Sequence, residues 1–446
     1  MARSVCSSKL PFTFSERLTL GWSRVFRWRV SLSAAVKPSL PVRAIGLAAV
    51  YCLTWSAAQA QTFSTLYSFK APLNAGNISA GLTPGSNGVF YGASNTGGKY
   101  GNGRLFYLAP PATSGGAWTL HVFHAFSTDE GPGPVSDLTL DSAGAIYGAS
   151  YPPTNFGNIF RITPPAGSGP WVEDILYSFP GGLMGAVPVG DLVFDAVGNL
   201  FGVTSQGGQY GNGVVYELSP PTVAGSPWTE TVLHSFQGNW DGANPVTLDH
   251  DLSGPLFGVC ANGGLSNAGT VFRLFPPSPT NPGWSFKVLY TFSGAADGAH
   301  PSGLKIYHGV KYGTTTSGGQ YGQGTAFHIV YAGGIFTTST IYSFGANTGD
   351  GFSPQGNLVA DAALNLYGIT SGGGTGSAGT AYRLTPPLNA GDPFTETLLH
   401  TFNAATDGAA PLGRLVLDGN GNLYGTTSLG IGQSANSSAV FEISPE

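Results

Sequence analysis

Charged residues are scarce in this sequence, and positive charge is scarcest after the first 60 residues. Asp, Glu, Lys and Arg make up 9% of the 446 residues. Residues 1–60 hold eight of the 18 Lys and Arg and one of the 23 acidic residues, so the remainder has 10 basic and 22 acidic residues and a net charge of −12. Nucleic acid phosphates require a basic face. We therefore expect no nucleic acid partner and no electrostatic attraction to anionic lipid.

Cysteine is nearly absent, and so are the usual motifs of cofactor sites. Cys6 and Cys52 fall within the first 60 residues, so the remainder has Cys260 alone and cannot form an internal disulfide. Sister segments place Thr near this position, so we interpret Cys260 as a packed strand residue and not as a nucleophile. There is no phosphate-binding loop, no Gly-x-Ser-x-Gly elbow and no zinc-type His spacing. We expect no metal site and no cofactor, although a cation such as calcium stays open.

Long hydrophobic runs are missing, except for one near the N-terminus. After Arg43 the sequence is apolar from Ala44 to Trp55, which is short for a membrane span. The segment ends in Ala58-Gln59-Ala60, a small-x-small cleavage site. We interpret residues 1–60 as an export segment cleaved after Ala60, with an uncleaved anchor as the alternative. The protein is then expected in the periplasm, at the cell envelope or outside the cell, with no stable membrane span after cleavage.

Glycine, proline and aromatic residues are abundant. The sequence holds 68 Gly, 32 Pro, 27 Phe, 19 Tyr and 8 Trp. Disordered chains lack this much aromatic surface, and helices do not tolerate this much Gly and Pro. The composition therefore favours an all-β fold of many short strands joined by tight turns.

A unit of about 55 residues repeats seven times along the chain. Its clearest marker is an aromatic residue followed by Gly, at successive spacings of 54 to 57 residues. The pairs are Tyr91-Gly92, Tyr147-Gly148, Phe201-Gly202, Phe257-Gly258, Tyr312-Gly313, Tyr367-Gly368 and Tyr424-Gly425. A second marker places an aromatic residue eight positions before a Phe, as in Trp228 and Phe236. Two independent markers with the same period predict one supersecondary unit per repeat.

Each unit predicts four short antiparallel strands. In the last unit, Leu415 to Leu417 are predicted to form a first strand, the turn Asp418 to Gly421 follows, and Asn422 to Thr427 form a second strand. Gly-rich and Pro-rich loops lead to the third and fourth strands, which alternate with period two. Seven such units predict a seven-bladed β-propeller over residues 61–446.

The two ends of this region predict how the ring closes. Thr65 to Phe69 copy a fourth strand, whereas Ala439 to Ile443 copy a third strand with no fourth strand after it. Pairing the N-terminal strand with the last blade completes that blade and removes an open edge.

The repeat resembles the Gloeo/Verruco ("GloVer") tandem-repeat proteins of bacterial cell envelopes. The resemblance rests on units such as Asp407-Gly408-Ala409-Ala410-Pro411 with Asp418 to Thr427, and on the loop from Thr315 to Thr325. It covers nearly all of residues 62–446 and implies an exported repeat protein, but no particular reaction. Such proteins commonly carry a C-terminal anchoring tail. This sequence ends at Glu446, just after its last predicted strand, so we expect no such anchor here.

Two loop motifs are predicted to converge on one face of the propeller. The motif Asp-Gly-x-x-Pro begins at Asp241, Asp297, Asp350 and Asp407, with Glu130-Gly131 as a relative. The motif Gly-Gly-x-Tyr-Gly holds Tyr100, Tyr210 and Tyr321. Carboxylates can bind a cation and exposed rings can bind a sugar. The alternatives are an Asp that caps its own turn and a Tyr that packs its own loop.

Histidines are weighed as general bases because they titrate near neutral pH. His124, His234 and His400 fall in a fourth-strand position that is Tyr in other units (Tyr67, Tyr177, Tyr290, Tyr342), so we interpret them as structural. His300 replaces Asn244 inside the Asp-Gly-x-x-Pro motif, next to Asp297. We retain Asn244 and His300 as candidate ligand-binding residues.

Two functional classes remain open from the sequence. The first is a non-catalytic module that binds glycan or protein, and we favour it because the loop residues are largely those of the repeat. The alternative is a polysaccharide hydrolase or lyase that uses carboxylates at the central channel. We name no catalytic residue and expect a monomer.

Overall fold

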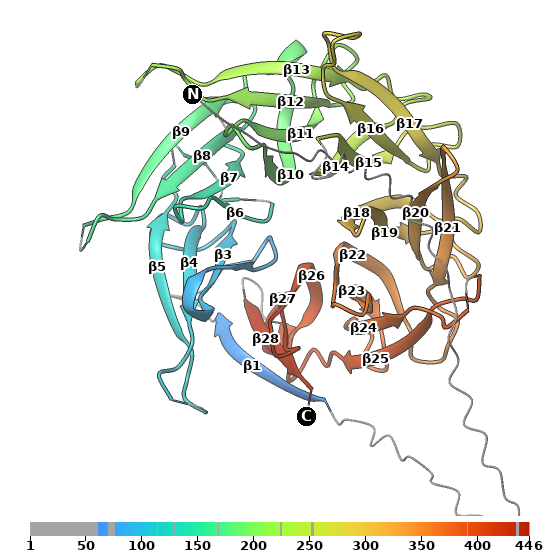
Figure 1. Ribbon diagram of the computed structural model, residues 1–446. Coiled ribbons are helices and arrows are strands. Elements are labelled where there is room, and N and C mark those ends of the chain that lie inside the picture. The colour runs from blue at the N-terminus through green and yellow to red at the C-terminus, as the bar shows by residue number, and fades with distance from the viewer. Residues whose placement is uncertain are drawn as a thin grey trace, which may run out of the picture. The chain divides into compact units, whose positions relative to one another are not determined.

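The computed structural model describes residues 61–69 and 76–445, except residues 114, 129, 132, 135, 153, 168, 224, 251–253, 390 and 434–436. The predicted export segment, residues 1–60, lies outside this part. The described residues form seven four-stranded antiparallel sheets arranged in a ring, which is the expected seven-bladed β-propeller (Figure 1). Apart from three short 3₁₀ turns, η1 (Ser86–Gly88), η2 (Gly182–Met184) and η3 (Ile431–Gln433), they contain no helix. No helix in this part could cross a membrane.

The first six blades each use four consecutive strands, ordered from the central channel outward. Blade 1 has β2 (Thr83–Pro84), β3 (Phe90–Ser94), β4 (Arg104–Ala109) and β5 (Thr119–Ala125). Blade 2 has β6 (Thr139–Leu140), β7 (Ile146–Ser150), β8 (Asn158–Thr163) and β9 (Val172–Ser178). Blade 3 has β10 (Ala186–Phe194), β11 (Leu200–Gln206), β12 (Val214–Ser219) and β13 (Thr229–Ser235).

The next three blades repeat this order, with longer inner strands than blades 1 and 2. Blade 4 has β14 (Ala243–His250), β15 (Leu256–Asn262), β16 (Thr270–Phe275) and β17 (Ser285–Thr291). Blade 5 has β18 (Ala299–Tyr307), β19 (Val310–Ser317), β20 (Thr325–Ala332) and β21 (Ile335–Ser343). Blade 6 has β22 (Gly351–Ala360), β23 (Leu366–Gly373), β24 (Thr380–Thr385) and β25 (Thr395–Thr401).

The N-terminal strand completes the seventh blade, as the sequence predicts. Blade 7 has β26 (Ala409–Leu417), β27 (Leu423–Leu429), β28 (Ser438–Ser444) and, outermost, β1 (Thr62–Phe69). Strand β1 runs antiparallel to β28, with Thr62 opposite Ser444 and Phe69 opposite Ser438. Figure 1 shows blue β1 beside red β28. No edge strand is left between the first and last blades.

The hydrophobic core is divided among the boundaries between blades. Seven clusters of buried side chains each combine residues of two neighbouring blades. At the closing boundary, Phe69 and Val440 of blade 7 pack with Phe90 and Phe106 of blade 1. Because every blade contributes to two of these clusters, the ring is stabilised by contacts between blades as well as within sheets.

The aromatic-Gly marker has a packing explanation. The Gly lies in the second strand, directly over an aromatic ring of the third strand. A Cβ atom on Gly258 would lie 2.4 Å from Cζ of Phe272, and one on Gly425 would lie 2.4 Å from Cζ of Phe441. Only a residue without a side chain lets these rings fill the space between blades.

Candidate functional site

The connections between strands divide the propeller into two faces. In an antiparallel sheet, the loop from the second to the third strand lies at the same end as the connection that leaves the fourth strand. We call this end the loop face. It comprises the described residues of the second-to-third-strand loops and of the connections between blades; these loops are 95–103, 151–157, 207–213, 263–269, 318–324, 374–379 and 430–437. The other two turns of each blade form the opposite face.

The Asp-Gly-x-x-Pro carboxylates bind their own loops. Asp241 is fully buried, and its Oδ1 accepts a hydrogen bond from the amide of Gln237 at 2.9 Å. Its Oδ2 lies 3.0 Å from Nε2 of His234 in the preceding outer strand. Asp407 repeats this arrangement, with His400 Nε2 at 3.0 Å from Oδ2 and the amide of Asn403 at 2.9 Å.

Tyrosine takes the place of histidine at two other boundaries. The hydroxyl of Tyr290 donates to Asp297 at 2.9 Å, and that of Tyr342 donates to Asp350 at 2.9 Å. The fourth-strand position that accepts Tyr or His is therefore the partner of the loop carboxylate. Burial raises the pKa of Asp297, but hydrogen bonds from Ser293 and, to a lesser extent, from Tyr290 bring it below its usual value. All four carboxylates cap their loops, and ligand binding by them stays a prediction.

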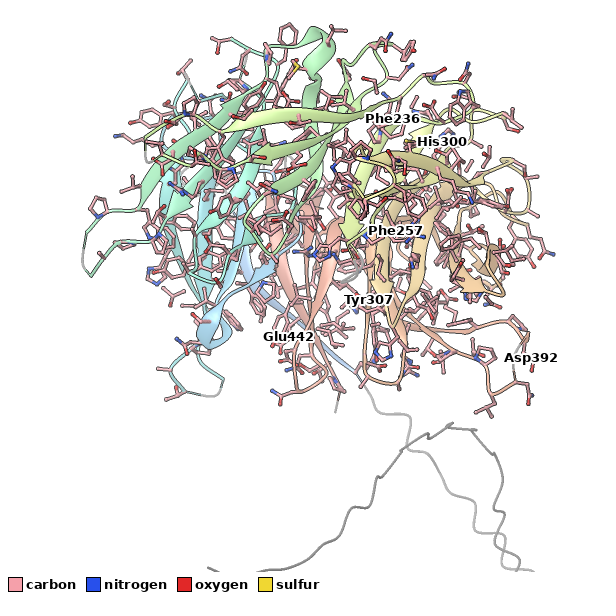
Figure 2. The ribbon with its side chains drawn as sticks, turned by 45° about the horizontal axis from the view of Figure 1, so that its top comes forward. Phe236, Phe257, His300, Tyr307, Asp392 and Glu442 are labelled. Carbon is pink, nitrogen blue, oxygen red and sulfur yellow. The ribbon has the colours of Figure 1, made fainter. Side chains whose placement is uncertain are left out.

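Asn244 and His300 lie within inner strands, not in loops as the motif suggested. Both have left-handed backbones, with φ of 53° and 57°. Their amides donate across blade boundaries to the carbonyls of Asn212 and Ala268, each at 2.9 Å. Asn244 Nδ2 donates to the carbonyl of Ser205 at 2.9 Å, and His300 Nδ1 lies 2.9 Å from the carbonyl oxygen of Ala261. His300, in the inner strand β18 of blade 5, is labelled in Figure 2.

The loop tyrosines differ from the carboxylates because they are exposed. Tyr100, Tyr210 and Tyr321 are 51%, 49% and 45% exposed. They occupy equivalent positions in blades 1, 3 and 5. Other aromatic side chains that are at least 41% exposed on the loop face are Tyr151, Phe156, Trp240 and Phe352. The loop face therefore presents aromatic rings from several blades to solvent.

The structure also reveals polar residues that the sequence analysis missed. A Leu lies in the inner strand of blades 3 to 7 and directly before it in blades 1 and 2, so the residue before that Leu lies at the inner edge of each blade. Unlike the loop motifs, this residue differs from blade to blade: Gly81, Asp137, Asp191, Thr247, Gly303, Asn357 and Arg414. Aligning the units on that Leu would have shown the variation in the sequence.

Arg414 joins several of these channel residues. Its Nη1 lies 3.1 Å from Oδ2 of Asp191 and its Nε lies 3.4 Å from Oδ2 of Asp137. Asn357 Nδ2 donates to the same oxygen of Asp191 at 3.1 Å. Burial raises the pKa of Asp137 to about 6, as does the charge of Asp191, while Arg414 acts in the other direction. The network links blades 2, 3, 6 and 7 across the channel.

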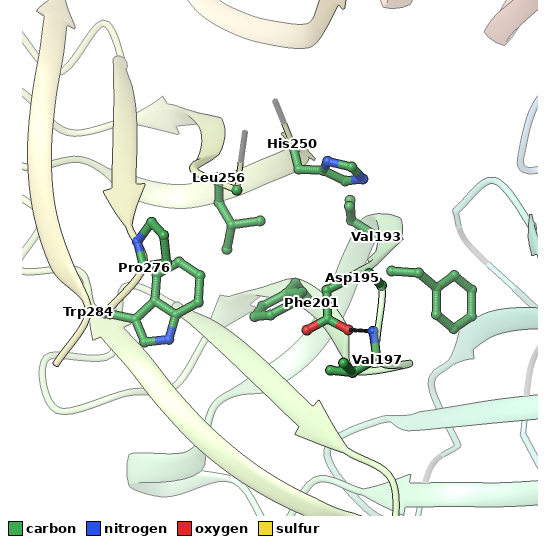
Figure 3. A pocket seen from close by; sticks show the side chains of 11 residues that line it. Val193, Asp195, Val197, Phe201, His250, Leu256, Pro276 and Trp284 are labelled. Atoms are coloured by element: carbon green, nitrogen blue, oxygen red, sulfur yellow. Dashed lines mark hydrogen bonds between the residues drawn. The ribbon is translucent and has the colours of Figure 1, made fainter. Parts of the chain in front are cut away.

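Two cavities lie toward the opposite face. One, of about 420 Å³, is at the end of the channel and is lined by Asp191, Asp249, His250, Lys305 and Arg414 among others. Its Asp249 is paired with Lys305 at 3.2 Å. The other, of about 610 Å³, lies between blades 3 and 4 and is mainly apolar (Figure 3). Its Asp195 accepts a hydrogen bond from the amide of Val197 at 2.9 Å, as turn capping requires.

Cys260 is fully buried in β15, and this burial raises the pKa of its thiol. A thiol in this position is neither accessible nor ionised near neutral pH, in agreement with a packing role.

Comparison with known proteins gives one family and several distant structures. A family model described as the Gloeobacter/Verrucomicrobia repeat matches residues 45–272, 168–304 and 246–446. No curated protein matches the sequence. Similar solved structures include an ulvan lyase (12% identity, TM-score 0.48, covering 79% of this chain and 91% of that one). A fungal alcohol oxidase in complex with copper has 13% identity and a TM-score of 0.49, with 86% and 76% covered. A protein of unknown function from Dyadobacter fermentans has 12% identity and a TM-score of 0.44, with 85% and 99% covered. These similarities are too low to carry an argument about function.

Proposed function

This chain belongs to the Gloeobacter/Verrucomicrobia repeat family, and we propose that it is an exported, non-catalytic module that binds glycan through its loop face. The observation that carries the proposal is the set of exposed rings contributed by Tyr100, Tyr210 and Tyr321 from alternate blades. Rings of this kind cover the apolar face of a sugar, and neighbouring amides and hydroxyls orient it.

The arrangement of the rings favours an extended or repetitive ligand. Equivalent positions around a ring present the same contact several times. Weak individual contacts then combine through effective concentration, provided that the ligand spans more than one blade. A polysaccharide of the cell envelope or its surroundings has the required repetition.

The test is glycan-array binding with matched Tyr→Ala variants. We expect Tyr321→Ala to weaken binding about tenfold, and the triple variant with Tyr100→Ala and Tyr210→Ala to abolish detectable binding. Tyr331→Ala is the control, because Tyr331 is 57% exposed in the β20–β21 hairpin on the opposite face. Equal binding by the wild-type protein and the triple variant would overturn the proposal. Binding to proteins but to no glycan would replace glycan by protein as the ligand class.

A polysaccharide-active enzyme is the second candidate, and the position of polar residues at the channel is the observation behind it. Asp191, Asp249 and His250 break the repeat and line the channel cavity, as catalytic groups in a propeller would. Both carboxylates are paired with cations or amides, which argues for a structural role. Turnover of a polysaccharide that Asp249→Asn removes and the triple Tyr variant retains would establish this candidate over the first.

A further inference from the structure

The boundary between blades 1 and 2 brings together a combination of side chains that the other boundaries lack among the described residues. His124 of β5, Glu130 of the following connection and Glu173 of β9 place one ligand atom each within 4.8 Å of one another. Nε2 of His124 lies 3.8 Å from Oε2 of Glu130 and 3.6 Å from Oε2 of Glu173. These distances are too long for hydrogen bonds.

The equivalent boundary between blades 5 and 6 shows how such a group is satisfied without an ion. There, the hydroxyl oxygen of Tyr342 lies within hydrogen-bond distance of both carboxyl groups, at 2.9 Å from Oδ2 of Asp350 and 2.7 Å from Oε2 of Glu396. Glu396 and Glu173 hold the same strand position, two residues after Phe394 and Trp171. Tyrosine thus fills the space between two carboxylates, and histidine at the same position leaves that space open.

The remaining boundaries supply further internal comparisons. His234 and His400 each pair with one carboxylate at 3.0 Å. Each also stacks on a phenylalanine, which holds the outer-strand position that Glu173 holds in blade 2. Ring centroids are 3.7 Å apart for His234 with Phe286, and 3.9 Å apart for His400 with Phe63. Histidine with two carboxylates therefore occurs, among the described boundaries, at the first alone.

Two polar atoms of this group lack a hydrogen bond among the described residues, whereas Oε2 of Glu130 accepts one from the amide of Ser127. Nε2 of His124 and Oε1 of Glu173 are buried and have no hydrogen bond to any described residue. Buried groups of this kind require an explanation such as a bound ion. In a tetrahedral zinc site, metal–ligand distances of about 2.1 Å put the ligand atoms about 3.4 Å apart. The two separations from Nε2 of His124, 3.8 and 3.6 Å, exceed that value by a few tenths of an ångström, and all three ligand atoms lie within 4.8 Å of one another.

From this geometry we propose that His124, Glu130 and Glu173 bind a divalent transition metal ion of the zinc class. One nitrogen and two carboxylate oxygens fill three positions and leave the fourth to water. The ion would have ligands from β5, from the connection after it and from β9, so it would cross-link blade 1 and blade 2 and stabilise their boundary. Calcium and magnesium are disfavoured, since they require six or more oxygen ligands.

Zinc titration of the full chain, stripped of metal, tests the site by calorimetry in excess Mg²⁺ and Ca²⁺. We expect the wild-type protein to bind a single equivalent of Zn²⁺ and to melt at a higher temperature with zinc. His124→Tyr removes the nitrogen ligand and recreates the arrangement around Tyr342, so it should fold but lose the tight equivalent. Glu173→Gln is a second variant and should weaken binding by at least about tenfold.

His400→Tyr is the matched control, because it makes the same change at a boundary with one carboxylate. It should bind zinc and respond to it as the wild-type protein does. The proposal is overturned if the wild-type protein binds no zinc. It is also overturned if both site variants bind as the wild type does, or if His400→Tyr loses binding equally, which would indicate adventitious histidine contacts.

Discussion

Side chains on the loop face are of two kinds at the scale of single residues. Carboxylates such as Asp241 and Asp407 accept hydrogen bonds from their own loops and from a preceding histidine. Tyr100, Tyr210 and Tyr321 keep about half of their surface in solvent. The hydrogen bonds of the carboxylates explain why the fold keeps them. The exposure of three equivalent tyrosine rings is not explained by packing. We infer that the reason is ligand contact.

Glu396 gives the stability of the protein a pH dependence. Burial raises the pKa of its carboxyl group to about 7, and Asp350 adds to the rise while the hydrogen bond from Tyr342 opposes it. The unfolded chain releases this proton near pH 4.5, the ordinary value. Between these two pKa values the folded state binds more protons than the unfolded state. Stability therefore falls as pH rises through this window.

The variant Glu396→Gln tests this dependence. Glutamine keeps an acceptor for the hydroxyl of Tyr342 but does not titrate. We expect the stability of the variant relative to wild type to rise by about 1 kcal/mol between about pH 5 and about pH 8, a value discounted for partial solvent exposure. Urea unfolding at both pH values measures it. Parallel losses of stability in the two proteins would contradict the assignment.

At the scale of loops and strands, the capping carboxylates hold the connections between blades in place. Asp241→Ala removes the acceptor of the Gln237 and Gly238 amides and leaves His234 without its partner. We expect it to lower the free energy of unfolding by about 2–3 kcal/mol and to leave glycan affinity unchanged in the folded protein.

The control for this prediction is Asp392→Ala. Asp392 lies in the loop between β24 and β25, and its hydrogen bond from Asn389 is exposed (Figure 2). Its loss should cost less than about 0.5 kcal/mol. If Asp241→Ala keeps full stability and loses ligand, the carboxylate binds ligand and does not cap.

Much of the element structure can be predicted from the sequence because it repeats. The spacing of the aromatic-Gly pairs predicted seven second strands. The Gly of each pair is restricted because a side chain there would overlap the ring of the third strand, as Gly258 and Phe272 show. The inner strands of blades 4 to 7 begin within the loop motif, so Asn244 and His300 were expected in loops and lie in strands. Motif boundaries and strand boundaries differ because the motif's left-handed residue bonds to the neighbouring blade.

The channel network could not be predicted in the same way. Asp191 and Arg414 are 223 positions apart in the sequence, yet they form an ion pair. Such a contact follows from ring closure and from the order of blades around the channel, not from any local pattern. The group around His124 was missed for a similar reason, because Glu173 belongs to the next unit, and its position is Glu in only two other units and Leu, Phe or Thr in the rest.

At the scale of the whole molecule, β1 closes the ring. It covers the edge of β28 and contributes Phe69 to the core between blades 7 and 1. Without it, β28 would present unpaired backbone groups and the closing core would lose a fully buried ring.

Deleting residues 61–69 tests this closure. We expect the deletion to destabilise the protein by at least about 3–5 kcal/mol, the cost of losing a buried Phe, and to promote association through β28. Thermal unfolding and light scattering after size-exclusion chromatography measure the two effects. A variant that lacks residues 1–60 alone serves as the control. A monomer of unchanged stability after deletion of 61–69 would show that β1 is dispensable.

Hydrogen exchange of the protein with and without its bound glycan is the most direct test of the central claim that the loop face binds the ligand. We predict that protection on binding falls on loops 95–103, 207–213 and 318–324, around Tyr100, Tyr210 and Tyr321. Protection confined to the inner strands around Asp249, or to the hairpins of the opposite face, would contradict the claim.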